Sequence, residues 1–155
     1  MSWLSSQQLE RFILHHADAV TRRGFLGVFP MNQLPRHVPH LPALLIVNTQ
    51  TDNLPGQHWL CLFLTGDGRG EVFDSFGMAP PPSITRWLRR RVRDWTYNRF
   101  TYQSPLSATC GAFVLYVALH RFRHRSLTET LRVFTPSLTS NDEFVTQYYR
   151  TLNKR

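Results

Sequence analysis

The feature that most constrains this fold is a run of ten uncharged, mainly apolar residues, 110–119, in a chain of 155 residues. A helix built on this run, expected over about 108–122, has apolar side chains on every face and must be buried all round. The run is half as long as the ~20 residues that a membrane-spanning helix needs. We therefore expect a globular core packed around this helix, and no membrane partner.

The size and composition of the chain agree with one globular unit. A length of 155 residues suits a single domain over residues 1–155, and a hydrophobic content of 42% is enough for a packed core. The segment 5–10 is polar where a secretory signal would be apolar. Two cysteines without a CxxC pair indicate neither a disulfide framework nor a zinc site, which favours a reducing compartment.

Helices are predicted near both ends of the chain and after residue 80. Three capping boxes, each a serine followed three residues later by Gln or Glu, begin at Ser5, Ser126 and Ser140 and introduce helices. Between residues 84 and 95, apolar residues recur at helical spacing and predict one amphipathic helix. Residues 21–41 mix glycine and proline with scattered apolar residues and are expected to be irregular but packed.

Four segments are predicted as strands: 42–48, 58–64, 71–76 and 98–103. The second is apolar on both alternating faces after His58, which is typical of a central strand covered on each side. A glycine-rich turn joins it to the third strand as a hairpin. These elements predict an α+β fold, with a small, largely antiparallel or mixed sheet flanked by helices.

Cys110 is the candidate nucleophile, because it lies where the loop 103–109 enters the buried helix. A helix N-terminus offers free N–H groups and partial positive charge, which stabilise a thiolate. The adjacent Gly111 lets the backbone approach a substrate closely. The alternative is a small buried residue that starts a core helix. Cys61 lies in mid-strand among apolar neighbours and is interpreted as a core residue.

Three further side chains complete a candidate site for covalent acyl transfer. His58, at the mouth of the central strand and after a turn expected at 53–56, is the candidate base. Asp74, expected inside the neighbouring strand, needs a partner there and is placed to fix the imidazole tautomer. Gln103 can offer its amide to an oxyanion beside the N–H of Cys110. His58 and Gln103 are individually more typical of surface residues, and only the set of four indicates catalysis.

The order of these residues resembles that of the adenovirus proteases (adenains) and, more distantly, of the SUMO-processing proteases. The residues that carry the resemblance are His58-Trp59, Asp74, Gln103 and Cys110-Gly111. Segments 25–27, 46–49 and 72–77 resemble adenain segments in the same succession, so the resemblance covers about 20–122. Papain has the reverse order, with cysteine before histidine, which excludes a plain papain relative.

The resemblance implies a role for each matched residue and an adenain-like cysteine protease fold. Cys110 would be the nucleophile, His58 the general base, Asp74 its orienting group and Gln103 the oxyanion residue. Trp59 and Gly111 would contact substrate, with Trp59 walling a narrow cleft for small residues such as glycine. The alternative for Trp59 is a core or edge aromatic residue.

This sequence departs from the adenain pattern in two ways. Adenains carry a glutamate where Asp74 stands, and the SUMO-processing proteases carry an aspartate. Adenains also use a disulfide-tethered viral peptide as an activator, whereas no cysteine occurs here between residues 62 and 109. Activation by a non-covalently bound viral peptide is left open.

The chain has a formal net charge of +8, and five arginines lie close together on the helix predicted after residue 80: Arg86, Arg89, Arg90, Arg91 and Arg93. Such a cluster can follow phosphates, and the resemblance to adenains implies DNA as a cofactor; a solvated helix face is the equal alternative. His120 and His124 have the spacing of a metal pair but lack a third ligand, so no metal is expected.

These observations predict a cysteine endopeptidase of the adenain type that cleaves viral precursor proteins at glycine-containing sites. The chemistry needs no cofactor, and DNA is left open as an activating partner. Two alternatives remain: an isopeptidase that deconjugates ubiquitin or SUMO, and a catalytically idle DNA-binding virion protein. The resemblance implies a monomer located in the virion and the host cell nucleus.

Overall fold

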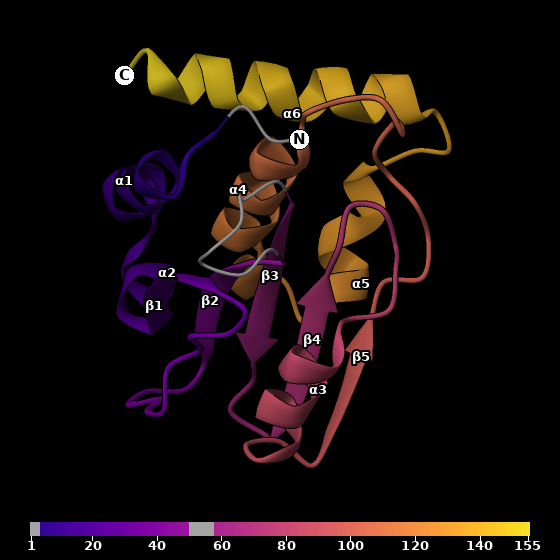
Figure 1. Ribbon diagram of the computed structural model, residues 1–155. Helices are drawn as coiled ribbons and strands as arrows, with labels where there is room; N and C mark the ends of the chain where they lie inside the picture. Colours follow the sequence, from indigo (N-terminus) through magenta and orange to yellow (C-terminus); the bar gives the residue numbers. More distant parts are fainter. Residues whose placement is uncertain (1–3, 50–57) are drawn as a thin grey trace.

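The computed structural model describes residues 4–49 and 58–155 and shows a sheet lying between helices (Figure 1). The turn expected at 53–56 lies outside the described residues. The helices are α1 (Ser6–His16), α2 (Ala19–Gly24), α3 (Pro82–Arg89), α4 (Cys110–His120), α5 (Leu127–Thr130) and α6 (Leu138–Asn153), with 3-10 turns η1 (Arg121–Arg123) and η2 (Leu131–Val133). The strands are β1 (Phe25–Pro30), β2 (Ala43–Asn48), β3 (Trp59–Leu64), β4 (Arg69–Phe73) and β5 (Asp94–Tyr97).

The sheet is five-stranded and mixed, in the order β1-β2-β3-β4-β5. The two inner pairings, β2 with β3 and β3 with β4, are antiparallel, and the two outer pairings are parallel. Alternate residues of β3 enter two separate cores: Cys61 and Phe63 face one, and Leu60 and Leu62 face the other. The predicted α+β class and the central position of this strand are confirmed.

The larger core is built around α4, the helix that the apolar run predicts. Residues 110–119 are all buried, and α4 packs against β3, α1 and α6. The smaller core lies on the opposite face of the sheet under α3. The sheet therefore has α4 on one face and α3 on the other. The first residue of α4 lies near one end of the central strands.

The segment 21–41 was expected to be irregular, and that expectation is wrong for its first ten residues. They form α2 and the parallel edge strand β1. The register of β1 shifts between Phe25 and Val28, and Gly27 there has a φ of 132°, which favours glycine. A bulged edge strand that contains glycine and proline has no clear alternation, so the strand signal is absent from the sequence.

The helix predicted over 84–95 ends early, at Arg89, and Trp95 lies in β5 instead. Trp95 still packs against the smaller core, together with Val92 and the buried side chains of α3. The apolar spacing therefore correctly indicated which residues share a core but not the local structure. No strand forms at 98–103, where one was expected, and β5 lies earlier, at Asp94–Tyr97. Asp74 follows β4 rather than lying inside a strand.

The predicted helix starts hold at two positions of three. Ser5 forms a complete capping box with Gln8, and the side chain of Ser126 accepts a hydrogen bond from the N–H of Glu129. The last helix, α6, begins one turn before the predicted Ser140 and is capped by Ser137. Within the described ranges, no helix is both long and apolar enough to cross a membrane.

Candidate active site

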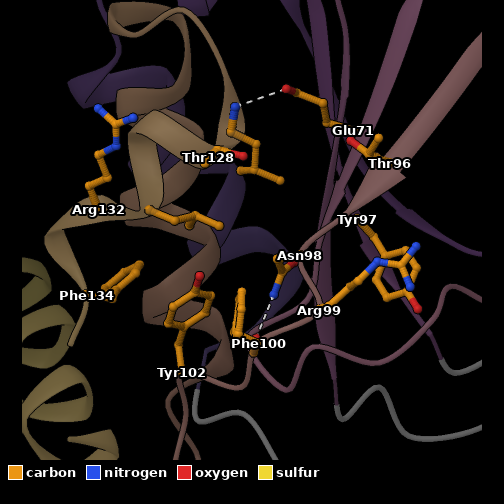
Figure 2. A pocket seen from close by; sticks show the side chains of 12 residues that line it. Glu71, Thr96, Tyr97, Asn98, Arg99, Phe100, Tyr102, Thr128, Arg132 and Phe134 are labelled. Carbon is orange, nitrogen blue, oxygen red and sulfur yellow. Dashed lines mark hydrogen bonds between the residues drawn. The ribbon is translucent and has the colours of Figure 1, made fainter. Parts of the chain in front are cut away.

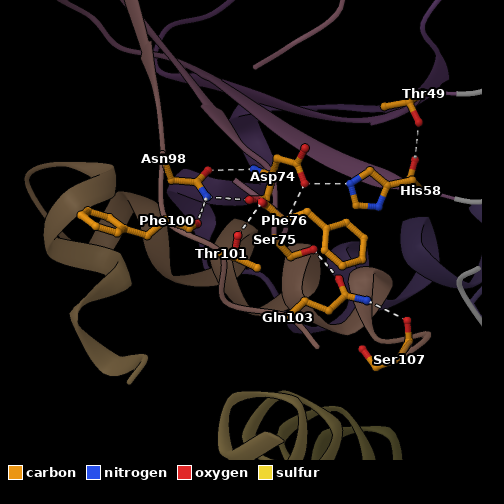
Figure 3. A network of polar contacts seen from close by, with 10 residues as sticks. All are labelled: Thr49, His58, Asp74, Ser75, Phe76, Asn98, Phe100, Thr101, Gln103 and Ser107. Carbon is orange, nitrogen blue, oxygen red and sulfur yellow. Dashed lines mark hydrogen bonds and ion pairs between the residues drawn. The ribbon is translucent and has the colours of Figure 1, made fainter. Parts of the chain in front are cut away.

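The fold brings His58, Asp74 and Cys110 together at one end of the central strands β3 and β4. His58 immediately precedes β3 and Asp74 immediately follows β4, and because these strands are antiparallel neighbours, the two residues meet. Cys110 is the first residue of α4, which packs on β3. His58 is itself tied to the residue after β2, since its carbonyl accepts the N–H of Thr49 at 3.1 Å. The Thr49 hydroxyl donates to the same carbonyl at 3.5 Å (Figure 3).

Asp74 holds the imidazole of His58 from one side. Its Oδ1 lies 2.8 Å from His58 Nε2 and also accepts the N–H of Phe76 at 2.8 Å. The ring of Phe76 stacks on the imidazole with the centroids 5.0 Å apart. Asp74 is only 4% exposed, so both contacts are shielded from water. This arrangement leaves Nδ1 as the ring nitrogen available to Cys110.

The environment of His58 favours its protonated form. Burial by itself would lower the pKa of His58, but hydrogen bonds to Asp74 and Cys110, and the negative charges of both, raise that pKa from 6.5 to about 9. The imidazole is therefore cationic at neutral pH and faces the sulfur of Cys110. An imidazolium beside a cysteine at a helix N-terminus is the setting in which a thiolate is stabilised.

The two cysteines are equally buried but differ in their neighbours. Cys110 hydrogen bonds with His58 at the start of α4, whereas Cys61 lies in mid-strand in the larger core. Burial, with a smaller contribution from the charge of Glu71, raises the pKa of the Cys61 thiol well above its usual range. The interpretation of Cys61 as a core residue fits this environment.

Gln103 is bonded to Ser75, the residue that follows Asp74, and its carboxamide is held at both ends. Its Oε1 accepts the hydroxyl of Ser75 at 2.5 Å, and its Nε2 donates to the carbonyl of Ser107 at 3.0 Å (Figure 3). A carboxamide has two N–H groups, so one N–H remains for another acceptor. Ser75 is a contact that the sequence did not indicate.

Asn98 fixes the backbone of Asp74, and the sequence did not indicate this role. Its Oδ1 accepts the N–H of Asp74 at 2.8 Å, and its Nδ2 donates to the Asp74 carbonyl at 2.5 Å and to the Phe100 carbonyl at 3.2 Å. Asn98 also lines a hollow of about 520 Å³ next to β5 and α5, shown in Figure 2. His58 and Cys110 do not line that hollow, so it is separate from the candidate site.

The segment 102–109, which leads into α4, is fastened to α6 by two adjacent side chains. Asn141 donates to the carbonyl of Tyr102 at 3.1 Å. The carboxylate of Asp142 accepts the hydroxyl of Thr109 at 2.9 Å and that of Ser107 at 3.3 Å. The capping-box pattern around Ser140 includes both residues but gives no sign of these long-range contacts.

Trp59 is buried, 3% exposed, in the same core as Cys61 and Cys110. Its indole N–H has no hydrogen-bond partner within residues 4–49 and 58–155. Gly111 is buried as the second residue of α4. Neither residue lines the hollow next to β5 and α5, and their contact with substrate stays a prediction.

The five arginines do not share one helix face, which corrects the expected arrangement. Only Arg86 and Arg89 lie within α3. Arg91 donates to the carbonyls of Trp87, Pro35 and Arg36 and lies over the Trp87 ring, and Arg93 donates to the carbonyl of Asp67. Arg91 and Arg93 thus have structural partners. Arg86, Arg89, Arg90 and also Arg93 are exposed, and Arg91 is half-buried.

Within the described part of the chain, no group of three or more His, Cys, Asp or Glu side chains is arranged to hold a metal ion. His120 hydrogen bonds with the carbonyl of Tyr116 at 2.8 Å and stacks on its ring. Burial lowers the pKa of His120. The contacts of His120 are therefore those of local packing on α4.

Comparison with known proteins places this geometry in context. No family model matches the chain. The protease of fowl adenovirus A (serotype 1) is 32% identical to this chain, over 68% of the chain and 60% of the relative. Two crystal structures of the ASFV pS273R protease superpose with TM-scores of 0.65 and 0.62, at 17% and 18% identity. They cover 94% and 91% of this chain, and 67% and 64% of theirs.

This chain has the fold of a viral protease. The resemblance to the adenovirus proteases is confirmed by the fowl adenovirus relative. The chain spans 60% of the length of that relative. The protease fold accounts for the position of the candidate site, because His58 and Asp74 adjoin the ends of the central strands β3 and β4, and Cys110 begins the central helix α4.

Proposed function

We propose that the chain is a cysteine endopeptidase of the adenain type, with Cys110 as nucleophile, His58 as base, Asp74 as its orienting group and Gln103 as oxyanion donor. The observation that carries the proposal is the continuous relay from the Asp74 carboxylate through a protonated His58 to Cys110 at a helix N-terminus. The adenovirus relative and the shared fold support the reaction class.

The first half of the reaction follows from this geometry. The thiolate of Cys110 attacks the carbonyl carbon of the scissile peptide, and the carbonyl oxygen becomes an oxyanion. The second N–H of Gln103 and the backbone N–H of Cys110 stabilise that oxyanion. As the intermediate collapses, the C–N bond breaks and the leaving amine takes the proton of the His58 imidazolium, which leaves a thioester on Cys110.

The second half reverses these roles. A water molecule attacks the thioester carbonyl while neutral His58 accepts one of its protons. The second oxyanion uses the same donors, and its collapse breaks the C–S bond. The acid product leaves, and the thiolate–imidazolium pair is restored. Asp74 holds the ring in the same orientation throughout, because its Oδ1 is fixed by Phe76 as well as by His58.

The substrate class rests on the resemblance, which also implies the role of Trp59. A narrow cleft walled by Trp59, next to Gly111, would favour glycine at the cleavage site. The substrates would be viral precursor proteins. The protease would act on them as a monomer, in the virion and the host nucleus. Because Asp74 stands where adenains carry glutamate, deconjugation of ubiquitin or SUMO is the second candidate. DNA would contact the exposed Arg86, Arg89 and Arg90 most readily, with Arg91 and Arg93 beside them.

Cleavage of a peptide panel, against ubiquitin-like fusions, tests the proposal. We expect hydrolysis of glycine-containing peptides that Cys110→Ala abolishes and that the matched core variant Cys61→Ala retains. Preferential cleavage of the fusions would favour the isopeptidase. Adding DNA should raise the rate at low salt and lose that effect at high salt; no effect at any ionic strength excludes DNA as a cofactor.

Thiol alkylation near neutral pH gives an independent readout. Cys110 should react faster than Cys61, and His58→Ala should slow Cys110 alone. If the two cysteines react equally and His58→Ala changes nothing, the catalytic assignment is wrong and the idle virion protein becomes the better account.

A further inference from the structure

We propose that Ser75 is a positioning residue that fixes the orientation of the Gln103 carboxamide, so that the N–H not bonded to Ser107 is available to the oxyanion. This inference rests on the proposed function, because it concerns how the oxyanion donor of that reaction is oriented. The Ser75 hydroxyl donates to Gln103 Oε1 at 2.5 Å, and both residues are almost fully buried, 0% and 1% exposed (Figure 3).

The chemistry of the contacts determines which way the carboxamide faces. The carbonyl of Ser107 can only accept a hydrogen bond, so the group that faces it at 3.0 Å must be the Gln103 NH₂. The opposite end is then the oxygen, and the Ser75 hydroxyl must donate to it. A flipped carboxamide would place two oxygens against each other at Ser107 and leave its NH₂ at Ser75.

Ser75 also fixes the backbone on which Gln103 is carried. Its carbonyl accepts the N–H of Tyr102 at 2.8 Å and the N–H of Gln103 at 3.1 Å. One residue therefore holds Gln103 by both main chain and side chain. Neither contact is part of the sheet, so the pairing serves to place these irregular segments relative to each other.

The neighbour of Ser75 in sequence is Asp74, which orients His58. The dipeptide 74–75 consequently controls two separate parts of the proposed reaction: Asp74 the base and Ser75 the oxyanion donor. Asn98 brackets the N–H and carbonyl of Asp74 and keeps this dipeptide in place. The inference predicts that the two functions can be separated by mutating one residue at a time.

Without the Ser75 hydroxyl, Gln103 Oε1 loses its donor and the carboxamide is free to rotate about its last torsion. The oxyanion donor would then be correctly placed only part of the time. Loss of one oxyanion donor costs about 10²–10³ in kcat in well-studied proteases. Because Ser75→Ala disorders the donor without removing it, we expect a fall in kcat of about 10- to 100-fold, with KM nearly unchanged.

The test compares kcat and KM of the full chain with those of Ser75→Ala, Gln103→Ala and the double variant, and measures alkylation of Cys110 in each. Alkylation forms no oxyanion, so Ser75→Ala should leave its rate unchanged while kcat falls. The double variant should be no slower than Gln103→Ala, since Ser75 acts through Gln103. Thr130→Val removes another buried hydroxyl, bonded to the Ser126 carbonyl at 2.9 Å, and should retain full kcat.

Three results would overturn the inference: wild-type kcat in Ser75→Ala, an equal further loss when Ser75→Ala is added to Gln103→Ala, or alkylation that falls in step with kcat. These differ from failure of the proposed function itself. In that case Cys110→Ala keeps wild-type turnover, or Gln103→Ala has no effect on kcat, and both proposals fail together.

Discussion

Two buried carboxylates stand three residues apart at one strand, and they have opposite uses. Glu71 lies in β4 and pairs with Arg121, whose Nε is 2.5 Å from its Oε1; its Oε2 accepts the N–H of Leu127 at 3.0 Å. Asp74 follows β4 and pairs with His58 at 2.8 Å. Both carboxylates are nearly inaccessible to solvent, and both receive a backbone N–H in addition to a cationic side chain.

The difference between the pairs lies in the cation. A guanidinium keeps its charge at any physiological pH. Other N–H groups of Arg121 donate hydrogen bonds to the carbonyls of His124 and Arg125. The imidazole of His58 can release its proton, and its second nitrogen faces Cys110 rather than the backbone. Burial of an ion pair by itself therefore does not indicate catalysis. Catalysis is indicated when the cationic partner can release its proton and has a second nitrogen that faces a reactive group.

The largest effect is expected for Asp74→Asn. Asparagine keeps the size of the side chain but carries no charge, so the pKa of His58 falls and the preferred imidazole tautomer is lost. Comparable changes in protease triads cost about 10⁴ in kcat, and we expect a loss of about 10²–10⁴-fold with the fold retained. Steady-state kinetics with circular dichroism checks this. Activity within threefold of wild type would show that Asp74 is a second structural carboxylate like Glu71.

Glu71→Gln is expected to give the opposite result, a loss of stability without a loss of chemistry. The change leaves the buried Arg121 charge uncompensated, which typically costs about 3–5 kcal/mol. Chemical denaturation measures this cost, and kcat at a temperature where the variant is folded should match wild type. Replacing both partners, Glu71→Leu with Arg121→Met, should recover much of the stability. A fall in kcat of the folded Glu71→Gln variant would contradict the division of roles.

The smallest effect is a pH dependence of stability that only the His58 pair should show. The folded state raises the pKa of His58 from 6.5 to about 9, so it binds the proton more tightly than the unfolded state does. Its stabilisation is therefore complete below pH 6.5 and is lost as the pH rises through about 9. In Cys110→Ala, which removes the thiol proton from the balance, stability measured by denaturation should decrease as the pH rises above 6.5. The decrease should be weaker when Asp74→Asn is added and retained when Glu71→Gln is added. An unchanged slope in Asp74→Asn would be evidence against the raised pKa.

The parts of the fold that the sequence predicts well are those whose apolar residues can be buried in only one kind of secondary structure. The segment 110–119 is apolar all round, and β3 is apolar on both faces, so each must be buried and each is. The segment around Trp95 is different, because a helix and a strand can both deliver its side chains to the smaller core. Only the tertiary structure distinguishes the two, which is why β5 was not predicted.

The same distinction applies to the site. His58, Asp74, Gln103 and Cys110 could be proposed from residue type and order, and the hairpin makes the meeting of His58 and Asp74 a consequence of strand pairing. Ser75 and Asn98 could not. They contact groups 28 and 24 residues away, between segments without regular structure, and no periodicity in the sequence reports such a contact.

The fastening of the active-site loop to α6 has a consequence for how the protein is made. A ribosome releases His58, Asp74, Gln103 and Cys110 before it releases Asn141 and Asp142, since the chain emerges from its N-terminus. Until α6 has been synthesised and docked, the carbonyl of Tyr102 and the hydroxyl of Thr109 lack the partners that hold the loop. The order of synthesis therefore delays completion of the site until nearly all of the fold around it exists.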